Sequence, residues 1–210
     1  MTADALAAWV QVRSRIDWTS GAGQIPAPVE PIVDGLTIWC TEGGRSSDLA
    51  RGQRLLAALA QSRTDARRRR PLTCGLLAEW QQLVLGTTEV QFRQGDAFAK
   101  GGRERYGLTP HTQRDFEHCL RESADPRVPL ASRAARAYLD VAFFHPFPDG
   151  NARLATLALA YVLELEGVRL DQVGPLQTTR YADDAAGAAD LAALVFVLIR
   201  SMHQRATSSR

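Results

Sequence analysis

The stretch HPFPDGNARLAT, residues 145–156, decides how this sequence folds and what it does. It lies between two segments of helical periodicity, and it gathers a histidine, an aspartate, a glycine, an asparagine and an arginine. Pro146 and Pro148 cannot continue the preceding helix, because proline lacks an N–H donor and clashes with the previous turn. We therefore expect the chain to bend here, with Phe147 anchored in the core and a second helix opening around residues 149–151.

The residues at this bend suit phosphate chemistry. The first turn of a helix has unpaired N–H groups and partial positive charge, which together attract anions. Gly150 lets the backbone approach a ligand, and the guanidinium of Arg153 can reach phosphate oxygens. Asp149 can hold Mg²⁺ beside phosphates, and His145, with an ordinary pKa of about 6.5, can accept a proton. The set indicates phosphoryl or nucleotidyl transfer to a hydroxyl, although a helix C-terminus favours the protonated form of His145.

The same stretch resembles the signature of the Fic (Fic/Doc) family, usually written H-x-F-x-[D/E]-G-N-G-[R/K]-x-x-R. The matching positions are His145, Phe147, Asp149, Gly150, Asn151 and Arg153. Two positions depart from the signature, because Ala152 replaces its second glycine and Thr156 replaces its last arginine. The resemblance extends over roughly residues 50–205 and weakens toward the start of the chain.

The resemblance implies an all-α fold, a Fic-type helical bundle with a short β-hairpin flap over the active site. Residues 1–46 would form an N-terminal helix and loop extension, and residues 47–206 the Fic-like domain. It also implies a nucleotidyltransferase that moves AMP from ATP to a Ser, Thr or Tyr hydroxyl of a target protein (AMPylation). ATP is then the co-substrate and Mg²⁺ the cofactor.

The resemblance also implies a role for each site residue. His145 would be the general base, and Asp149 would bind the Mg²⁺ that bridges the phosphates. The nucleotide-binding positions would be Gly150, Asn151 and Ala152, through their backbone, and Arg153. The flap would align the target by strand-like pairing, and its target-binding positions would be Val90, Phe92, Arg93 and Phe98.

The departure at Thr156 has two consequences. In the family, the last arginine contacts the terminal phosphate and, in many members, pairs with an inhibitory glutamate in the motif [S/T]-x-x-x-E-[G/N]. Only Glu42 and Glu166 precede Gly or Asn, and Ile38 and Val162 stand four residues before them. We therefore expect no restraint by the chain's own glutamate. The side chains expected to hold the far end of the nucleotide are Lys100, Arg103 and Arg105.

Other functions remain open at this point. Because Ala152 departs from the signature, phosphoryl or other nucleotidyl transfer remains an alternative to AMP transfer. Asp149 and Asn151 are also favoured helix N-caps, and a histidine after a helix is often structural, so a non-catalytic nucleotide- or protein-binding module is a further alternative. A transition-metal site on His145 and Asp149 would lack a third ligand. The expected partner is a target protein with an exposed hydroxyl, and an inhibitory antitoxin-like protein is a second candidate.

The composition limits the class of protein. A chain of 210 residues with 45% apolar residues predicts one globular domain by default. A net charge of +2 does not indicate a protein that binds nucleic acid or a membrane surface. No uncharged apolar run reaches membrane-spanning length. Cys40, Cys74 and Cys119 are far apart in the sequence, which indicates free thiols in a reducing cytoplasm.

The apolar pattern predicts the elements around the bend. Residues 20–35 are expected to form a loop, the arginine-rich residues 63–70 a solvated helix end, and residues 88–92 a strand that turns at Gly95 and Asp96. The expected helices lie within the first twenty residues, over residues 47–63, from Pro71 to Gly86, from Pro110, before His145, over residues 154–165 and over residues 191–202.

Overall fold

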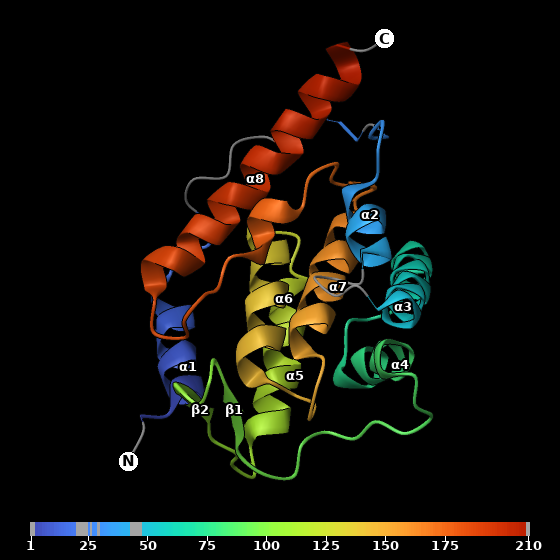
Figure 1. Cartoon of the computed structure of the whole chain (residues 1–210). Helices are drawn as coiled ribbons and strands as arrows, with labels where there is room; N and C mark the ends of the chain where they lie inside the picture. Colours follow the sequence, from blue (N-terminus) through green and yellow to red (C-terminus); the bar gives the residue numbers. More distant parts are fainter. Residues whose placement is uncertain (1–2, 20–24, 26, 29, 43–47, 209–210) are drawn as a thin grey trace.

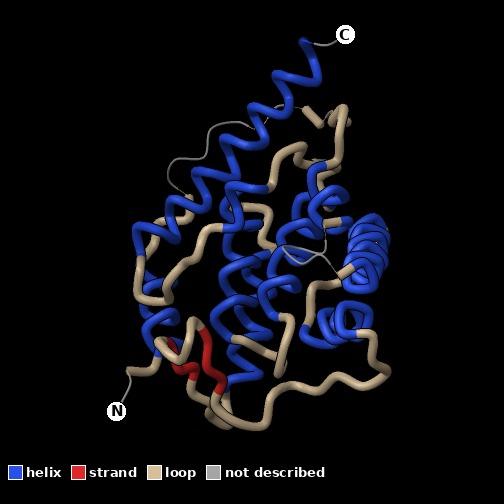
Figure 2. The backbone as a smooth tube through the Cα atoms, in the orientation of Figure 1, coloured by secondary structure: helices blue, strands red, loops and turns tan. Residues whose placement is uncertain are grey.

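A computed structural model describes residues 3–19, 25, 27–28, 30–42 and 48–208 of the chain. Over these residues the fold consists of eight α-helices, one short 3-10 helix and one two-stranded antiparallel sheet (Figure 2). The predicted all-α class with a small β-hairpin is therefore confirmed. The predicted domain boundary at residues 46 and 47 lies outside the described residues.

Two central helices organise the fold. The helices are α1 (Ala5–Arg15), α2 (Gly35–Thr41), α3 (Leu49–Arg67), α4 (Cys74–Leu85), α5 (Thr112–Ser123), α6 (Leu130–Phe144), α7 (Asn151–Glu164) and α8 (Ala185–Ser208). The strands are β1 (Ala97–Ala99) and β2 (Glu104–Tyr106). Helices α6 and α7 pack side by side at the centre, with α3 and α4 on one side and α1 and α8 on the other (Figure 1). The hairpin lies beside α1, near the end of α6 (Figure 1).

The first four helices are fixed at their starts by side-chain caps. Asp4, Asp34, Asp48 and Thr73 each accept a hydrogen bond from a first-turn N–H group, which stabilises a helix N-terminus. The Thr73 cap explains why α4 starts at Cys74 and not at Pro71 as predicted. The short helix α2 was not predicted, because it is only seven residues long and too short to show a helical repeat.

The hairpin forms later in the chain than predicted. The strand expected over residues 88–92 is absent from the described structure, and Ala97 instead pairs with Tyr106 across β1 and β2. The turn falls at residues 100–102, where φ is 56°, 67° and 85°. Two of these three left-handed positions are glycines, for which this conformation carries no Cβ penalty. The predicted turn at Gly95 and Asp96 is therefore wrong.

The arginine-rich end of α3 is ion-paired and partly buried, not simply solvated as predicted. Arg63 lies 2.6 Å from Asp34, at the cap of α2, and Arg67 lies 2.8 Å from Glu164, near the end of α7. Asp65 is fully buried, although it lies in the middle of the run. These pairs attach α3 to its two neighbours.

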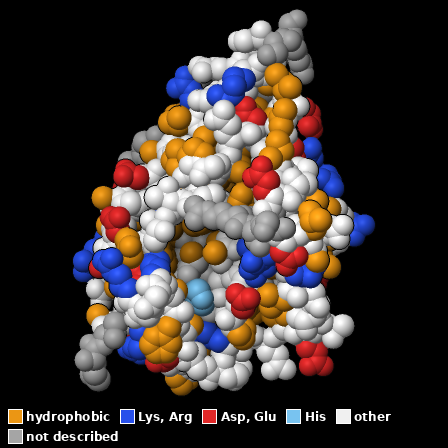
Figure 3. Space-filling view, viewed as in Figure 1, with side chains coloured by type: hydrophobic (Ala, Val, Ile, Leu, Met, Phe, Trp, Pro, Cys, Tyr) orange, Lys and Arg blue, Asp and Glu red, His pale blue; other side chains and the backbone are white. Residues whose placement is uncertain are grey.

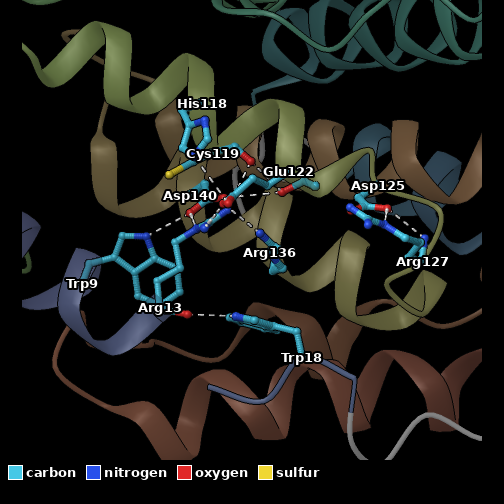
Figure 4. Close-up of polar contacts among 11 residues, drawn as sticks. Trp9, Arg13, Trp18, His118, Cys119, Glu122, Asp125, Arg127, Arg136 and Asp140 are labelled. Carbon is cyan, nitrogen blue, oxygen red and sulfur yellow. Dashed lines mark hydrogen bonds and ion pairs between the residues drawn. The ribbon is translucent and has the colours of Figure 1, made fainter. Parts of the chain in front are cut away.

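A buried polar cluster attaches α1 to the bundle (Figure 4). The carboxylate of Asp140 on α6 is fully buried, and it accepts hydrogen bonds from Trp9 Nε1 at 3.0 Å and Arg13 Nε at 2.7 Å. Arg13 also pairs with Glu122 on α5. A buried charge is tolerated only when it is paired and hydrogen-bonded. The N-terminal helix is therefore part of the core assembly.

The three cysteines are free, as predicted, and all of them are buried. Burial raises the pKa of each thiol, in Cys40, Cys74 and Cys119, to about 12. Protonated, inaccessible thiols of this kind are chemically inert.

Helix α8 is long and apolar enough, by length and composition alone, to cross a membrane. Leu191, Val195 and Ile199 along it are nevertheless buried in the same core as α6 and α7. A core helix of a globular protein meets the same criteria, so the length and composition of α8 are weak evidence for a membrane span.

Removal of the buried carboxylate should strongly destabilise the fold. We expect Asp140→Ala to lower the free energy of unfolding by about 3–5 kcal/mol, because it leaves the Trp9 N–H unpaired and removes the buried carboxylate from Arg13, which keeps only its pair with Glu122 and its bond to the carbonyl of Cys119. Urea denaturation followed by circular dichroism measures this loss. Asp125→Ala is the matched control, since its partner Arg127 is exposed (Figure 4) and the loss should be far smaller. An equal loss of unfolding free energy in both variants would contradict the stabilising role of the buried Asp140.

Candidate functional site

The bend between α6 and α7 is closed by one side chain. Asn151 Oδ1 accepts a hydrogen bond from the N–H of Phe147 at 3.0 Å, and its Nδ2 donates to the carbonyl of Phe147 at 2.6 Å. The Phe147 ring is fully buried, as expected for the anchor. Asn151 is itself buried, so its side chain holds the loop and only its backbone remains for a ligand.

Helix α7 starts without a side-chain cap. Its N-cap is Gly150, at a φ of 78°, and none of the described side chains bonds to the first-turn N–H groups. A Cβ on Gly150 would come within 2.5 Å of Gln81 Nε2, so glycine is required here on both conformational and steric grounds. Gln81 in turn donates to the carbonyl of Asp149. The uncapped N–H groups form the kind of site that binds an anion.

The two departures from the family signature have simple structural explanations. Ala152 lies in the first turn of α7 and is absent from the positive-φ residues of the described chain, so its position does not need glycine. Thr156 is buried, and its hydroxyl donates to the carbonyl of Ala152 at 3.2 Å. Thr156 therefore cannot take part in phosphate binding.

His145 is held in one orientation with one nitrogen left free. It caps α6 in the left-handed conformation, and its ring stacks on Tyr106 with centroids 5.1 Å apart. Nδ1 lies 3.3 Å from the carbonyl oxygen of Ala142. Because a carbonyl only accepts, this contact assigns the proton to Nδ1 and leaves Nε2 as an acceptor. Nε2 can therefore act as a base.

Burial keeps this imidazole neutral. Burial is the largest of the effects that lower the pKa of His145 below its ordinary value of 6.5. The positive charges of Arg93 and Lys100 lower this pKa further. The carbonyl of Ala142 and the carboxylate of Asp149 oppose the shift but do not cancel it. Burial thus outweighs the effect of the helix C-terminus, which alone would favour the protonated form.

The site opens into a cavity of about 300 Å³, large enough for a small ligand. Its lining residues are Trp39, Ala99, Lys100, Tyr106, Tyr138, Leu139, Ala142, Phe143, His145, Ala152, Arg153, Gln177, Thr178, Thr179 and Arg180. On the two central helices, only Tyr138, Ala142 and Ala152 are not buried, and all three line this cavity. In the space-filling view, a hollow with a histidine in it has basic side chains on both sides (Figure 3).

Asp149 and Arg153 lie at the polar end of the site. The Arg153 guanidinium is mostly buried and lies 3.5 Å from the Asp149 carboxylate, whose side chain is 76% exposed. Groups of three or more potential metal-binding side chains are absent from the described residues. Mg²⁺ usually takes one or two carboxylates together with substrate phosphates, so the exposed Asp149 fits this ion.

The predicted target-binding residues lie in different environments. Phe98 is 61% exposed on β1, where a partner could reach it. Val90 and Phe92 are half-buried against the core. Arg93 is buried and donates to the carbonyls of Gly95 and Gly107, so it supports the loop and does not face a partner.

Among the three flap cations proposed for the far end of the nucleotide, only Lys100 lines the cavity, and it is paired with Glu104. Arg103 lies over the ring of Tyr181, with 4.3 Å from the guanidinium carbon to the ring centroid. Arg105 pairs with Asp96 at 2.7 Å. Arg103 and Arg105 are therefore directed to other partners.

Several cavity residues were missed by the sequence analysis. Trp39 comes from the unpredicted helix α2, and Arg180 from the segment before α8. Tyr106, the stacking partner of His145, lies in the strand that was misplaced. Tyr138 had a usable signal, because it stands two helical turns before His145 on the same face.

Comparisons with known proteins find similarity over part of the chain. Residues 71–163 match the family model described as the Fic/DOC family. The fold is similar to a Fic domain-containing signaling protein from Bacteroides thetaiotaomicron VPI-5482, with 18% identity, a TM-score of 0.51, and coverage of 80% of this chain and 77% of that one. It is also similar to Fic-1 (residues 134–508) from C. elegans, with 17% identity, a TM-score of 0.52, and coverage of 82% and 57%. A search of curated proteins finds no match.

The electrostatics of His145 can be tested by NMR titration. We expect its pKa to lie below 6.5, so that the ring is neutral at pH 7 and protonates only as the pH falls further. Lys100→Gln should raise this pKa, because it removes a positive charge that opposes protonation. Arg103→Gln is the matched control, since its charge lies over Tyr181, and it should change the pKa less. A pKa above 6.5 in the unmodified protein would contradict the burial argument.

Proposed function

Because residues 71–163 match the Fic/DOC family model, we propose that the protein transfers AMP from ATP to a Ser, Thr or Tyr hydroxyl of a target protein. Fic domains commonly catalyse AMPylation or other nucleotide transfer. One observation carries the proposal for this chain: a neutral imidazole with a free Nε2 and the uncapped start of α7 border the same cavity. A base for an alcohol and a site for a phosphate are thus side by side.

The reaction follows from this arrangement. Nε2 of His145 accepts the proton of the target hydroxyl. The hydroxyl oxygen forms a bond to the α-phosphorus of ATP while the bond from that phosphorus to the bridging oxygen breaks. AMP remains on the target, and diphosphate leaves with the bonding electrons. The stack on Tyr106 and the bond to Ala142 hold the imidazole in position during the transfer.

Three groups stabilise the phosphate charge. The first-turn N–H groups of α7 bind the α-phosphate, and the Arg153 guanidinium pairs with the next phosphate. Asp149 would hold Mg²⁺, and the bound ion would supply positive charge beside the phosphate oxygens. Asn151 acts indirectly in this scheme, because its amide holds the backbone that carries the N–H donors.

The target segment docks on β1. The outer edge of β2 is taken by a parallel bridge between Asp4 and Arg105, whereas β1 pairs only with β2 in the described sheet. An extended segment can therefore add to the free edge of β1 through backbone hydrogen bonds. Phe98 supplies an exposed apolar contact on that strand.

Labelled ATP separates the possible reactions. We expect a lysate incubated with the protein, Mg²⁺ and ATP to retain label from the α-phosphate on a target protein, with a mass increase of one AMP by mass spectrometry. Retention of γ-label instead would mean phosphoryl transfer. Nucleotide binding without either label would mean a non-catalytic binding module. Both of these outcomes contradict the proposal.

His145 should be essential for the reaction and dispensable for the fold. We expect His145→Ala to lower the transfer rate by about 10²–10⁴-fold, since it removes the general base, with ATP still bound. His111→Ala is the matched control, because that residue is exposed at the start of α5, and its rate should be unchanged. A His145→Ala variant that retains its transfer rate would exclude this role.

A further inference from the structure

Two arginines of α3 lie near Arg153, which lines the cavity. Arg51 and Arg54 are one turn apart, and their positive charges help to lower the pKa of Arg153 at the start of α7, although burial is the largest cause. Neither residue belongs to the Fic signature or to residues 71–163. They lie about 100 residues before Arg153, so only the fold brings the three side chains together.

Helix α3 also packs directly against α7. At the C-terminal ends of the two helices, Arg67 contacts Glu164 at 2.8 Å.

The end of α4 supplies a second anchor for the same region. The side chain of Arg54 lies against Gly86, where an added Cβ would come within 2.8 Å of its Cδ. An added Cβ on Gly150 would lie 3.3 Å from Leu85, the residue before Gly86. Arg54 and the start of α7 are thus in contact with the same end of α4.

The positive charge in this region is not neutralised. On the same helix, Arg63 and Arg67 have carboxylate partners, whereas the described residues provide none for Arg51 or Arg54. Arg54 Nε is buried without a hydrogen-bond partner among the described residues. Within the part of the chain that the structure describes, Arg153 has one carboxylate partner, the exposed Asp149. An arginine donor that has no protein partner beside an anion site is available to bind a phosphate oxygen.

We propose that Arg51 and Arg54 bind the terminal phosphates of the nucleotide, the β- and γ-phosphates of ATP and then the diphosphate that leaves. This inference rests on the proposed function and adds the residues that replace the missing signature arginine. Thr156 is buried and bonded to its own helix, so α7 offers no second guanidinium. In this proposal, Arg51 and Arg54 of the neighbouring helix α3 supply the missing positive charge near Arg153.

Calorimetric titration with ATP and AMP tests the assignment. We expect Arg51→Ala and Arg54→Ala each to weaken ATP binding by about tenfold or more, as for the loss of a charge-assisted hydrogen bond. Binding of AMP, which lacks the terminal phosphates, should be unchanged. Inorganic diphosphate should compete with ATP in the unmodified protein and fail to compete in the double variant. Arg68→Ala, an exposed arginine at the other end of α3, is the matched control.

The outcomes separate this inference from the proposed function. Unchanged ATP affinity in the double variant would overturn the inference, even if AMP transfer is observed. An equal loss of ATP and AMP affinity would also overturn it, because the residues would then support the fold and not the terminal phosphates. If diphosphate binds through Arg51 and Arg54 but no AMP transfer occurs, the phosphate site stands and the proposed function fails.

Discussion

The arrangement of the site depends on the two hydrogen bonds between Asn151 and the backbone of Phe147. They close the bend within four residues, so the end of α6 and the start of α7 have a fixed separation. That separation puts the His145 ring and the first-turn N–H groups of α7 at one cavity. The signature asparagine therefore acts through geometry, since its amide is occupied and buried. The groups that remain available to bind an anion are the first-turn N–H groups of α7 and the guanidinium of Arg153.

The neutral state of the imidazole depends on how the hairpin packs. A helix C-terminus stabilises a protonated histidine by about 0.3–1 kcal/mol at an exposed site, but the stack of Tyr106 on His145 excludes water and favours the neutral form. Glu104 holds this arrangement, because its carboxylate accepts from Tyr106, from Lys100 and from the N–H of Ala182. The short hairpin thus controls the protonation of the base as well as offering an edge to a partner.

Local sequence signals predicted the central helices, the bend and the signature residues, because caps, periodicity and proline act over a few positions. They failed where tertiary contacts decide the structure. Residues 88–92 alternate like a strand, yet Phe92 packs against Phe116, and Arg93 donates to backbone carbonyls, so the segment stays irregular. Trp39 gave no signal, since its seven-residue helix follows a loop rich in glycine and proline. The prediction for the arginine-rich residues 63–70 was also wrong, because Arg63 was expected in solvent and is buried against Asp34.

Segments before residue 71 contribute to the cavity together with the residues that match the Fic/DOC family model. Trp39 forms part of its wall, and Arg51 and Arg54 bring positive charge to the start of α7. A guanidinium at position 156 would project from α7 itself, whereas one on α3 approaches from a neighbouring helix and depends on how the two helices pack. The pair of Arg67 with Glu164 holds that packing at the opposite end. If Arg51 and Arg54 bind the terminal phosphates as proposed, nucleotide recognition is coupled to the attachment of α3, and a substitution that removes the Arg67–Glu164 pair would weaken phosphate binding.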